Sequence, residues 1–219
     1  MNMQPIFITG IGTGIGKTIV AAIVTEALEA DYWKPVQAGF EDGTDTLLIK
    51  DIISNTNTII HAEVYKLKLA ASPHISAAAE NITISLDTIQ NRFIQLQNTN
   101  LKVRTSHLII EGAGGLLVPL NEHELVIDLI KKLSAKVLLV SRNYLGSINH
   151  SLLTASVCKA HDIDVIGWVF NDQYMNYEEE IVRWSGYPKK GSVPFTASVS
   201  KTFIKKEAEK IKQSLLSSL

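Results

Sequence analysis

The sequence predicts an α/β fold with a doubly wound, mostly parallel sheet. Strand-like apolar runs alternate with helical patterns along the chain, which is the order found in sheets with helical crossovers. The apolar runs are continuous rather than alternating, as in Val137-Leu138-Leu139-Val140, so both faces of the sheet are expected to be buried. A glycine-rich turn joins the first strand to the first helix, and ligands in such folds bind at the carboxyl ends of strands.

Five apolar runs are expected to form the strands of this sheet. They cover residues 5–9, 32–36, 107–111, 136–141 and 165–170. Lys34 and Pro35 lie near the end of the second run, where the proline ring restricts the backbone. Because ligands bind where parallel strands end, the informative loops are those that follow Thr9, Lys34, Glu111, Ser141 and Asn171.

Seven segments have the apolar spacing that is typical of helices. The clearest stripe consists of Leu86, Ile89, Phe93 and Leu96, which recur on one helical face. The predicted helices are residues 17–30, 46–53, 86–97, 126–133, 148–160, 178–185 and 202–216. The polar stretch 98–106 is expected to be a surface loop.

The length and composition are typical of one globular domain over residues 1–219. The chain has 219 residues, of which 46% are hydrophobic, so it can bury a substantial core. Its 21 basic and 22 acidic residues give a net charge of −1. Electrostatics therefore give no reason to expect a nucleic acid or a membrane surface as a partner.

The expected location is the cytoplasm. The single cysteine, Cys158, excludes an intrachain disulfide and fits a small buried residue on a helix. No apolar run approaches the roughly 18 residues that are needed to span a bilayer. The first strand begins within a few residues of the N-terminus, which leaves no room for a signal peptide.

The turn after the first strand has the composition of a loop that wraps nucleotide phosphates. It comprises Gly10, Ile11, Gly12, Thr13, Gly14, Ile15, Gly16, Lys17 and Thr18. Its backbone N–H groups can bind phosphate oxygens, Lys17 supplies a cation, and the Thr18 hydroxyl can bind Mg²⁺. Five residues separate Gly10 from Gly16, one more than in the usual motif. The alternative is an ordinary glycine-rich turn, but the lysine–threonine pair favours the P-loop nucleoside triphosphate hydrolase fold.

Two charged residues at predicted strand ends are candidates for the same site. Lys34 by itself is most simply a solvated surface lysine, but beside Lys17 it is a candidate second cation for a reacting phosphoryl group. Glu111 ends a buried strand and precedes Gly112-Ala113-Gly114-Gly115. It is either an acidic terminus that meets solvent or the second metal-binding position of a phosphate-loop enzyme, and the glycines favour the second.

Two further residues have alternatives that the sequence leaves open. Asp45 is either the N-cap of the helix that follows it or a Mg²⁺ ligand. Asn171 is either a turn residue before Asp172 or an amide that pairs with the edge of a nucleotide base.

Taken in order, these motifs resemble the dethiobiotin synthetases of biotin biosynthesis over nearly the whole chain. The long phosphate loop is a trait of that family, and Asp45 falls at its metal-binding aspartate. The other matching segments are Lys34-Pro35-Val36, Ser72-Pro73-His74, Glu111-Gly112-Ala113-Gly114-Gly115 and Leu145-Gly146-Ser147-Ile148-Asn149-His150, with Asn171 and Pro194 at the adenine contacts.

The resemblance implies a ligase that uses ATP, Mg²⁺, CO₂ and 7,8-diaminononanoate. One amine takes up CO₂, the carbamate attacks the γ-phosphate, and the second amine closes the ureido ring. The implied cations are Lys17 and Lys34, Thr13 adds a hydroxyl or N–H group, and the metal ligands are Thr18, Asp45 and Glu111. The distal carboxylate of the substrate would lie on the N–H groups around Ser147, Ile148, Asn149 and His150 of a partner subunit, which implies a homodimer.

The sequence departs from well-known members of the family at three positions. They carry aspartate, glutamate and serine where this chain has Gly12, Gly14 and Ala38. The first two changes remove acidic side chains from the loop, and the third removes a hydroxyl near the reacting carbamate. None of them alters the lysines or the metal ligands, so activity is expected to remain.

Three other classes of protein are alternatives to a dethiobiotin synthetase. Partitioning ATPases usually carry an additional lysine early in the loop, which Gly10-Ile11-Gly12 does not contain. Cobyrinic-acid-type amide synthetases normally add a glutamine-hydrolysing domain with a nucleophilic cysteine, and this chain has neither the length nor a suitably placed cysteine for that. A module that binds nucleotide without turnover would be distinguished by its failure to consume a diamine.

Overall fold

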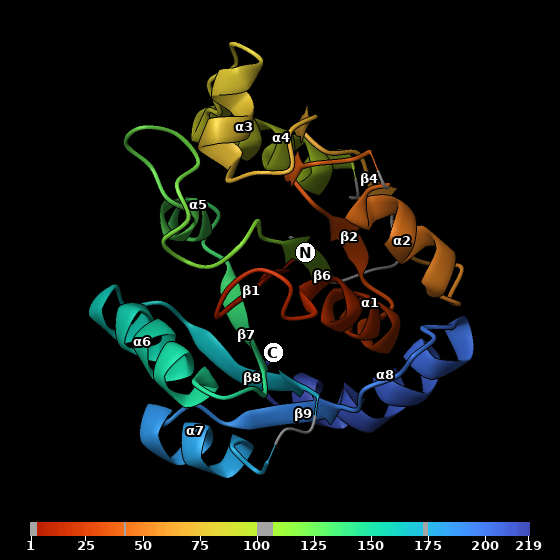
Figure 1. Ribbon diagram of the computed structural model, residues 1–219. Helices are drawn as coiled ribbons and strands as arrows, with labels where there is room; N and C mark the ends of the chain where they lie inside the picture. Colours follow the sequence, from red (N-terminus) through yellow and green to blue (C-terminus); the bar gives the residue numbers. More distant parts are fainter. Residues whose placement is uncertain (1–3, 42, 100–106, 173–174) are drawn as a thin grey trace.

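Seven parallel strands form the central sheet within the residues that the computed structural model describes, 4–41, 43–99, 107–172 and 175–219 (Figure 1). The order across the sheet is β4-β2-β6-β1-β7-β8-β9. The strands are β1 (Gln4–Gly10), β2 (Asp31–Trp33), β4 (Ile60–His61), β6 (His107–Glu111), β7 (Lys136–Arg142), β8 (Val165–Asn171) and β9 (Lys189–Val193). The chain moves from the central β1 to one edge, returns through β6 and extends to the other edge, as predicted for a doubly wound sheet.

Helices cover both faces of the sheet (Figure 1). One face carries α1 (Lys17–Leu28), α2 (Asp45–Ile52) and α8 (Lys201–Leu216). The other face carries α4 (Leu86–Thr99), α5 (Val126–Lys132), α6 (Ser147–Ala160) and α7 (Glu178–Ser185). The predicted helices therefore exist, with ends that differ from the prediction by no more than two residues.

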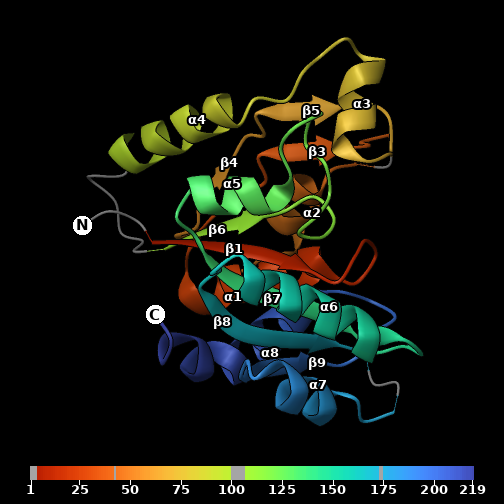
Figure 2. The ribbon, with the colours of Figure 1, turned by 90° about the vertical axis from the view of Figure 1, so that its left-hand side faces the viewer.

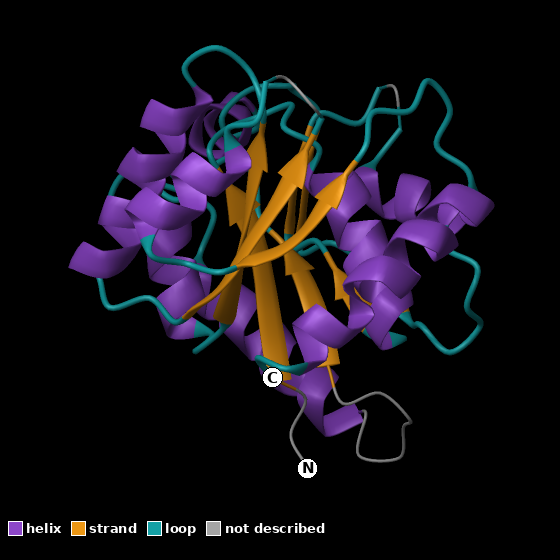
Figure 3. Ribbon diagram, turned by 90° about the horizontal axis from the view of Figure 1, so that it is seen from below, coloured by secondary structure: helices purple, strands orange, loops and turns teal. Residues whose placement is uncertain are grey.

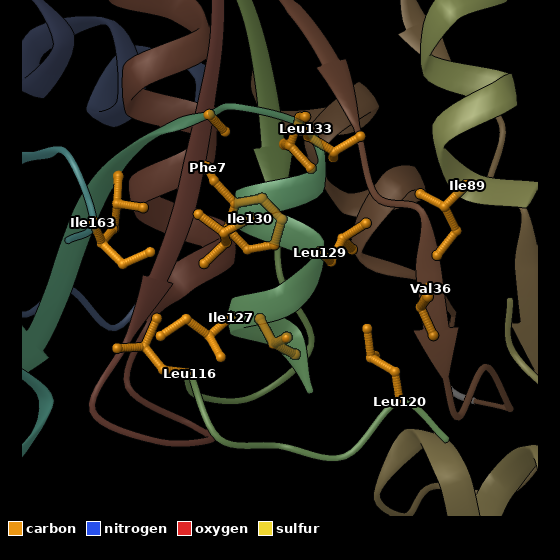
Figure 4. Packing of buried hydrophobic residues seen from close by; sticks show 14 of the residues in the cluster. Phe7, Val36, Ile89, Leu116, Leu120, Ile127, Leu129, Ile130, Leu133 and Ile163 are labelled. Carbon is orange, nitrogen blue, oxygen red and sulfur yellow. The ribbon is translucent and has the colours of Figure 1, made fainter. Parts of the chain in front are cut away.

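Neighbouring residues of one strand supply side chains to opposite cores. In β1, Ile6 and Ile8 pack on the side of α1, and Phe7 packs on the side of α5. All three side chains are fully buried, because successive strand residues point to opposite faces and both faces are covered. Figure 4 shows Phe7 among Ile127, Ile130 and neighbouring side chains of the core on the side of α5. This two-sided burial explains why the apolar runs are continuous.

The parallel sheet brings its carboxyl ends to one side of the molecule. Figure 3 shows the strand arrows running toward one side of the molecule, where loops gather. The loops after β1, β2, β6 and β8 are therefore neighbours although they are far apart in the sequence. This arrangement provides the place for a ligand site.

The predicted strand over residues 32–36 is wrong in its second half. β2 ends at Trp33, and a separate strand, β3 (Val36–Ala38), pairs in parallel with β5 (Tyr65–Leu67) in a small second sheet. Pro35 lies between the two strands and has no N–H group to donate to a sheet. Figure 2 shows this small sheet and α3 (Pro73–Ala79) beyond the β2–β4 edge of the main sheet.

Four short strands and one short helix were not predicted. β3, β4 and β5 have two or three residues each, and α3 has seven, which is too short for a periodic signal. β9 has the polar sequence Lys-Lys-Gly-Ser-Val and pairs with β8 at the edge of the sheet. In the predicted loop 98–106, residues 98 and 99 end α4, and residues 100–106 lie outside the described residues.

Two further expectations concern burial and membrane crossing. Cys158 lies on α6 and is fully buried, as predicted, and burial raises the pKa of its thiol to about 12. In the described part of the chain, none of the helices combines the length and the apolar character that a bilayer crossing needs.

Candidate functional site

The phosphate loop has the backbone geometry that its glycines predict. β1 ends at Gly10 and α1 begins at Lys17, so the loop lies between the centre of the sheet and a helix N-terminus. Gly14 has φ 71° and Gly16 has φ 84°, in the left-handed region that side chains disfavour. A Cβ atom at Gly16 would lie 2.5 Å from Asn171 Nδ2. Position 16 therefore favours glycine on conformational grounds, and a Cβ atom there would also crowd the Asn171 amide that donates to Ile15.

Lys17 is buried at the start of α1. Its Nζ donates a hydrogen bond of 2.6 Å to the carbonyl oxygen of Gly12, on the opposite side of the loop. Burial lowers the pKa of Lys17 to about 8, although Glu111 and Asp45 raise it in part and Lys34 lowers it further. Among the described residues, this ammonium group donates to a neutral carbonyl oxygen, and bound phosphates would supply an anionic partner.

Lys34 and Glu111 form the centre of a buried charged cluster. The exposed fraction is 5% for Lys34 and 1% for Glu111, so neither is the solvated residue that the sequence alone allowed. Lys34 Nζ lies 3.0 Å from Glu111 Oε1 and also forms an ion pair with Asp45. Burial by itself lowers the pKa of Lys34, but Glu111 and Asp45 outweigh this effect, and the pKa is raised above its usual value of 10.5.

Asp45 is the first residue of α2 rather than its N-cap. Thr44 is the cap, because its side chain accepts a hydrogen bond from the backbone N–H of Leu47. The Asp45 carboxylate therefore does not cap the helix and instead contacts Thr18 on α1 and Lys34 after β2. Burial raises its pKa, but Lys34, the hydrogen bond from Thr18 and the charge of Lys17 together outweigh burial and hold the pKa below its usual 3.8. The N-cap alternative is wrong by one residue.

Three oxygen atoms meet at the end of the phosphate loop. Thr18 Oγ1 lies 2.9 Å from Asp45 Oδ1 and 2.9 Å from Glu111 Oε1. One hydroxyl and two carboxylate oxygens in contact are a donor set that a hard divalent cation such as Mg²⁺ prefers. The residues present therefore fit the predicted magnesium site.

A cavity of about 750 Å³ opens beside this cluster. Lys17, Lys34 and Glu111 line it together with Ala38. Further lining comes from the phosphate loop and the loop after β6, through Thr13, Gly14, Gly16, Thr18, Gly112 and Gly114. The structure thus brings the predicted lysines, the predicted metal ligands and the small residues of both glycine-rich loops to one cavity.

A second cavity, of about 190 Å³, lies on the other side of the phosphate loop. Asn171 and Pro194 line it. Asn171 is the last residue of β8, and its Nδ2 donates a hydrogen bond of 2.6 Å to the carbonyl oxygen of Ile15. The left-handed residue of the following turn is Asp172, with φ 61°. Asn171 therefore ends a strand and holds the phosphate loop through a hydrogen bond. Neither of the roles considered from the sequence, a turn residue or an amide for a nucleotide base, includes that contact.

The predicted carboxylate site lies at the N-terminus of α6. Gly146 is the N-cap, with φ 103°, and Ser147 is the first helical residue and is buried. Neither they nor Ile148, Asn149 and His150 are among the described residues that line the 750 Å³ cavity. Within the described residues of one copy, this helix end therefore does not border the cavity that Lys17 and Lys34 line.

The comparisons with known proteins agree with this geometry. A family model described as an AAA domain matches residues 4–202. The ATP-dependent dethiobiotin synthetase BioD of Cytophaga hutchinsonii is 50% identical over 186 residues, which are 84% of this chain and 85% of that protein. The chain belongs to the ATP-dependent dethiobiotin synthetase family. A synthetase of the same name from Christiangramia forsetii is 40% identical over 210 residues, or 95% of this chain and 96% of its own length.

Solved structures support the fold alone. The MinC:MinD cell division protein complex of Aquifex aeolicus has a TM-score of 0.62 at 12% identity, covering 98% of this chain and 95% of that chain. The cell division ATPase MinD of Pyrococcus furiosus has a TM-score of 0.59 at 14% identity, covering 97% and 99%. The P-loop ATPase fold is thus shared, whereas the sequence relationship is to the dethiobiotin synthetases. The predicted resemblance and fold class are confirmed.

Three residues near the site of this synthetase family member were not singled out from the sequence. Tyr32 donates a hydrogen bond to Glu111, and Gln37 Oε1 accepts one from the backbone N–H of Asp45 at 3.3 Å. Arg142 donates to Asp172 and to the carbonyl oxygen of Gly14. Tyr32 lies inside an apolar strand run and gave no signal. Gln37 follows the Lys34-Pro35-Val36 motif, and Arg142 follows the predicted strand 136–141 and is the last residue of β7.

Proposed function

We propose that this protein converts 7,8-diaminononanoate, CO₂ and ATP into dethiobiotin, ADP and phosphate. Membership in the dethiobiotin synthetase family supports the activity. The observation that carries the proposal is the placement of two buried lysines, Lys17 and Lys34, on one cavity beside a phosphate loop. Cations in that position suit a reaction between two anions, a carbamate and a γ-phosphate.

The proposed sequence has three steps. One substrate amine attacks CO₂, forms a C–N bond and loses a proton, which gives a carbamate. A carbamate oxygen then attacks the γ-phosphorus atom, so that the bond to ADP breaks and a carbamic–phosphoric anhydride forms. The second amine attacks the anhydride carbonyl, loses a proton and releases phosphate, which closes the ureido ring.

Lys17 and Lys34 have separate roles in this proposal. Lys17 begins α1 inside the phosphate loop and would hold the β- and γ-phosphate oxygens. Lys34 follows β2 on the other side of the cavity and would hold the carbamate near the γ-phosphate. Thr13 lines the cavity from the loop and would contribute a hydroxyl or N–H group. These positively charged and donor groups lower the repulsion between the reacting anions.

Thr18, Asp45 and Glu111 would hold Mg²⁺. The bound cation would neutralise charge on the β- and γ-phosphates as it develops during transfer. In the geometry described above, Lys34 already neutralises part of the charge of Asp45 and Glu111. The cluster can therefore remain buried before nucleotide and metal arrive.

The remaining parts of the proposal concern the adenine, the assembly and the cell compartment. Asn171 and Pro194 would contact adenine in the smaller cavity. The substrate carboxylate would lie at the N-terminus of α6 from a second copy of the chain, so the working unit would be a homodimer of single domains covering residues 1–219. We further propose that it acts in the cytoplasm.

The test is phosphate release from Mg·ATP and bicarbonate, measured with and without 7,8-diaminononanoate, with the organic product weighed by mass spectrometry. Release that depends on the diamine is expected, with a product that has gained one carbonyl and lost two hydrogens. Steady release that is indifferent to the diamine would instead point to a partitioning-type ATPase and would leave Lys34 without a role.

A further inference from the structure

Tyr32 contacts the proposed metal site from inside the protein. Its hydroxyl donates a hydrogen bond of 2.8 Å to Glu111 Oε2. The side chain is fully buried, and it is absent from the lining of the 750 Å³ cavity. Tyr32 therefore touches a proposed metal ligand without facing the substrates.

Strand register explains why the two residues meet. β2 lies beside β6, with Tyr32 opposite Ile109. Ile109 and Tyr32 both belong to the core on the side of α1. Glu111 is two residues after Ile109 and points to the same face, since strand side chains alternate. Lys34 is likewise two residues after Tyr32, and both reach the Glu111 carboxylate.

The two oxygens of Glu111 have different surroundings. Oε1 accepts hydrogen bonds from Thr18 and Lys34, and both of those residues line the cavity. Oε2 accepts the hydrogen bond from Tyr32 on the buried side. The terminal torsion of a glutamate has broad minima, so a fixed donor to one carboxylate oxygen on the buried side holds the plane of the carboxylate and places the other oxygen at the cavity.

We propose that Tyr32 is a positioning residue that fixes the plane of the Glu111 carboxylate, so that one carboxylate oxygen is held at the cavity for the divalent cation. A phenol suits this task because it is a neutral donor and leaves the negative charge of Glu111 available to the cation. This inference rests on the proposed role of Glu111 as a metal ligand. Residues that orient metal ligands through hydrogen bonds affect metal affinity strongly.

The substitution Tyr32→Phe removes the hydroxyl and retains the ring. The binding of Mn²⁺ in the presence of ADP is measured by the electron paramagnetic resonance of free Mn²⁺. The half-saturating Mn²⁺ concentration is expected to rise by about 10- to 100-fold. The affinity for ADP in EDTA is expected to stay within about twofold, because among the described residues the phenol donates to Glu111 and not to a proposed phosphate ligand. A tenfold change in either affinity corresponds to about 1.4 kcal/mol.

The matched control is Tyr65→Phe. The Tyr65 hydroxyl also makes a hydrogen bond, accepting from the backbone N–H of Ser85 at 3.0 Å, but it lies on β5 and does not contact the charged cluster. Its removal is expected to leave Mn²⁺ binding unchanged. In a Glu111→Gln background, Tyr32→Phe is expected to add little further loss of Mn²⁺ affinity, because the group that it positions has already been changed.

Several results would overturn the proposal. One is a Mn²⁺ titration of Tyr32→Phe that coincides with the wild type, and another is an equal loss of ADP affinity in EDTA, which would indicate a general structural role. If Tyr32→Phe does not fold, the double variant Tyr32→Phe/Glu111→Gln is tested for folding. Recovered folding would support the proposed contact between Tyr32 and Glu111, and a failure to recover would contradict it. Since no diamine is used, these outcomes do not depend on the synthetase activity.

Discussion

Replacement of Lys34 by methionine would leave two carboxylates together without their buried cation. Lys34 Nζ lies 3.0 Å from Glu111 Oε1, and at an effective dielectric constant of about 20 this corresponds to roughly 5 kcal/mol of attraction before desolvation is counted. Asp45 adds a second attraction, which solvent screens more because 30% of its side chain is exposed. Removal of one partner from a buried charge pair typically costs about 3–5 kcal/mol.

Two effects are expected from Lys34→Met. Diamine-dependent phosphate release should fall by about 10²- to 10³-fold, the loss typical of one preorganised electrostatic group. The free energy of unfolding without ligands should fall by about 3 kcal/mol. Mg²⁺ with ADP should restore more stability to the variant than to the wild type, because a divalent cation can neutralise the two carboxylates left behind.

The assays are phosphate release with all substrates and thermal unfolding with and without Mg·ADP. Lys205→Met is the control, since Lys205 is an exposed lysine on α8. Turnover of Lys34→Met within about threefold of the wild type would refute the assigned role. A loss of stability that Mg·ADP does not relieve more strongly than in the wild type would refute the electrostatic explanation.

Three further predictions concern the loop and the core. Gly16→Ala should weaken nucleotide binding by about 10²-fold, as a Cβ at φ 84° would meet the Asn171 amide at 2.5 Å; calorimetric affinity near the wild-type value would contradict this. Lys17 has a pKa of about 8 in the free protein, and bound phosphates favour its charged form, so nucleotide binding should take up roughly 0.9 proton at pH 9 and about 0.1 at pH 7. Calorimetry in buffers of different ionisation enthalpy measures this proton uptake. Equal uptake at both pH values would exclude the titration of Lys17 as its source. Leu139→Ala in the fully buried centre of β7 should cost about 2–5 kcal/mol in urea unfolding, and a cost below about 1 kcal/mol would show that the core relaxes into the space.

The sequence predicted the features that depend on neighbouring residues. The phosphate loop is recognisable because glycines, Lys17 and Thr18 occur within one short segment between a strand and a helix. The central strands are recognisable because a strand buried on both faces requires an unbroken apolar run, as in β7. Both signals depend only on residues that are close in the sequence, so they can be recognised without knowing which segments are neighbours in the fold.

Tertiary structure decided the features that depend on distant residues. Tyr32 and Glu111 are separated by 79 positions, and only the register of β2 against β6 shows that the phenol meets the carboxylate. Pro35 interrupts the predicted second strand, but the pairing of Val36–Ala38 with β5 follows from contacts that no local pattern records. The polar strand β9 forms because it pairs with β8 at the edge of the sheet. Local composition thus determined the phosphate loop and the core strands, whereas strand register determined which side chains surround the charged cluster, because register places side chains that the sequence keeps apart.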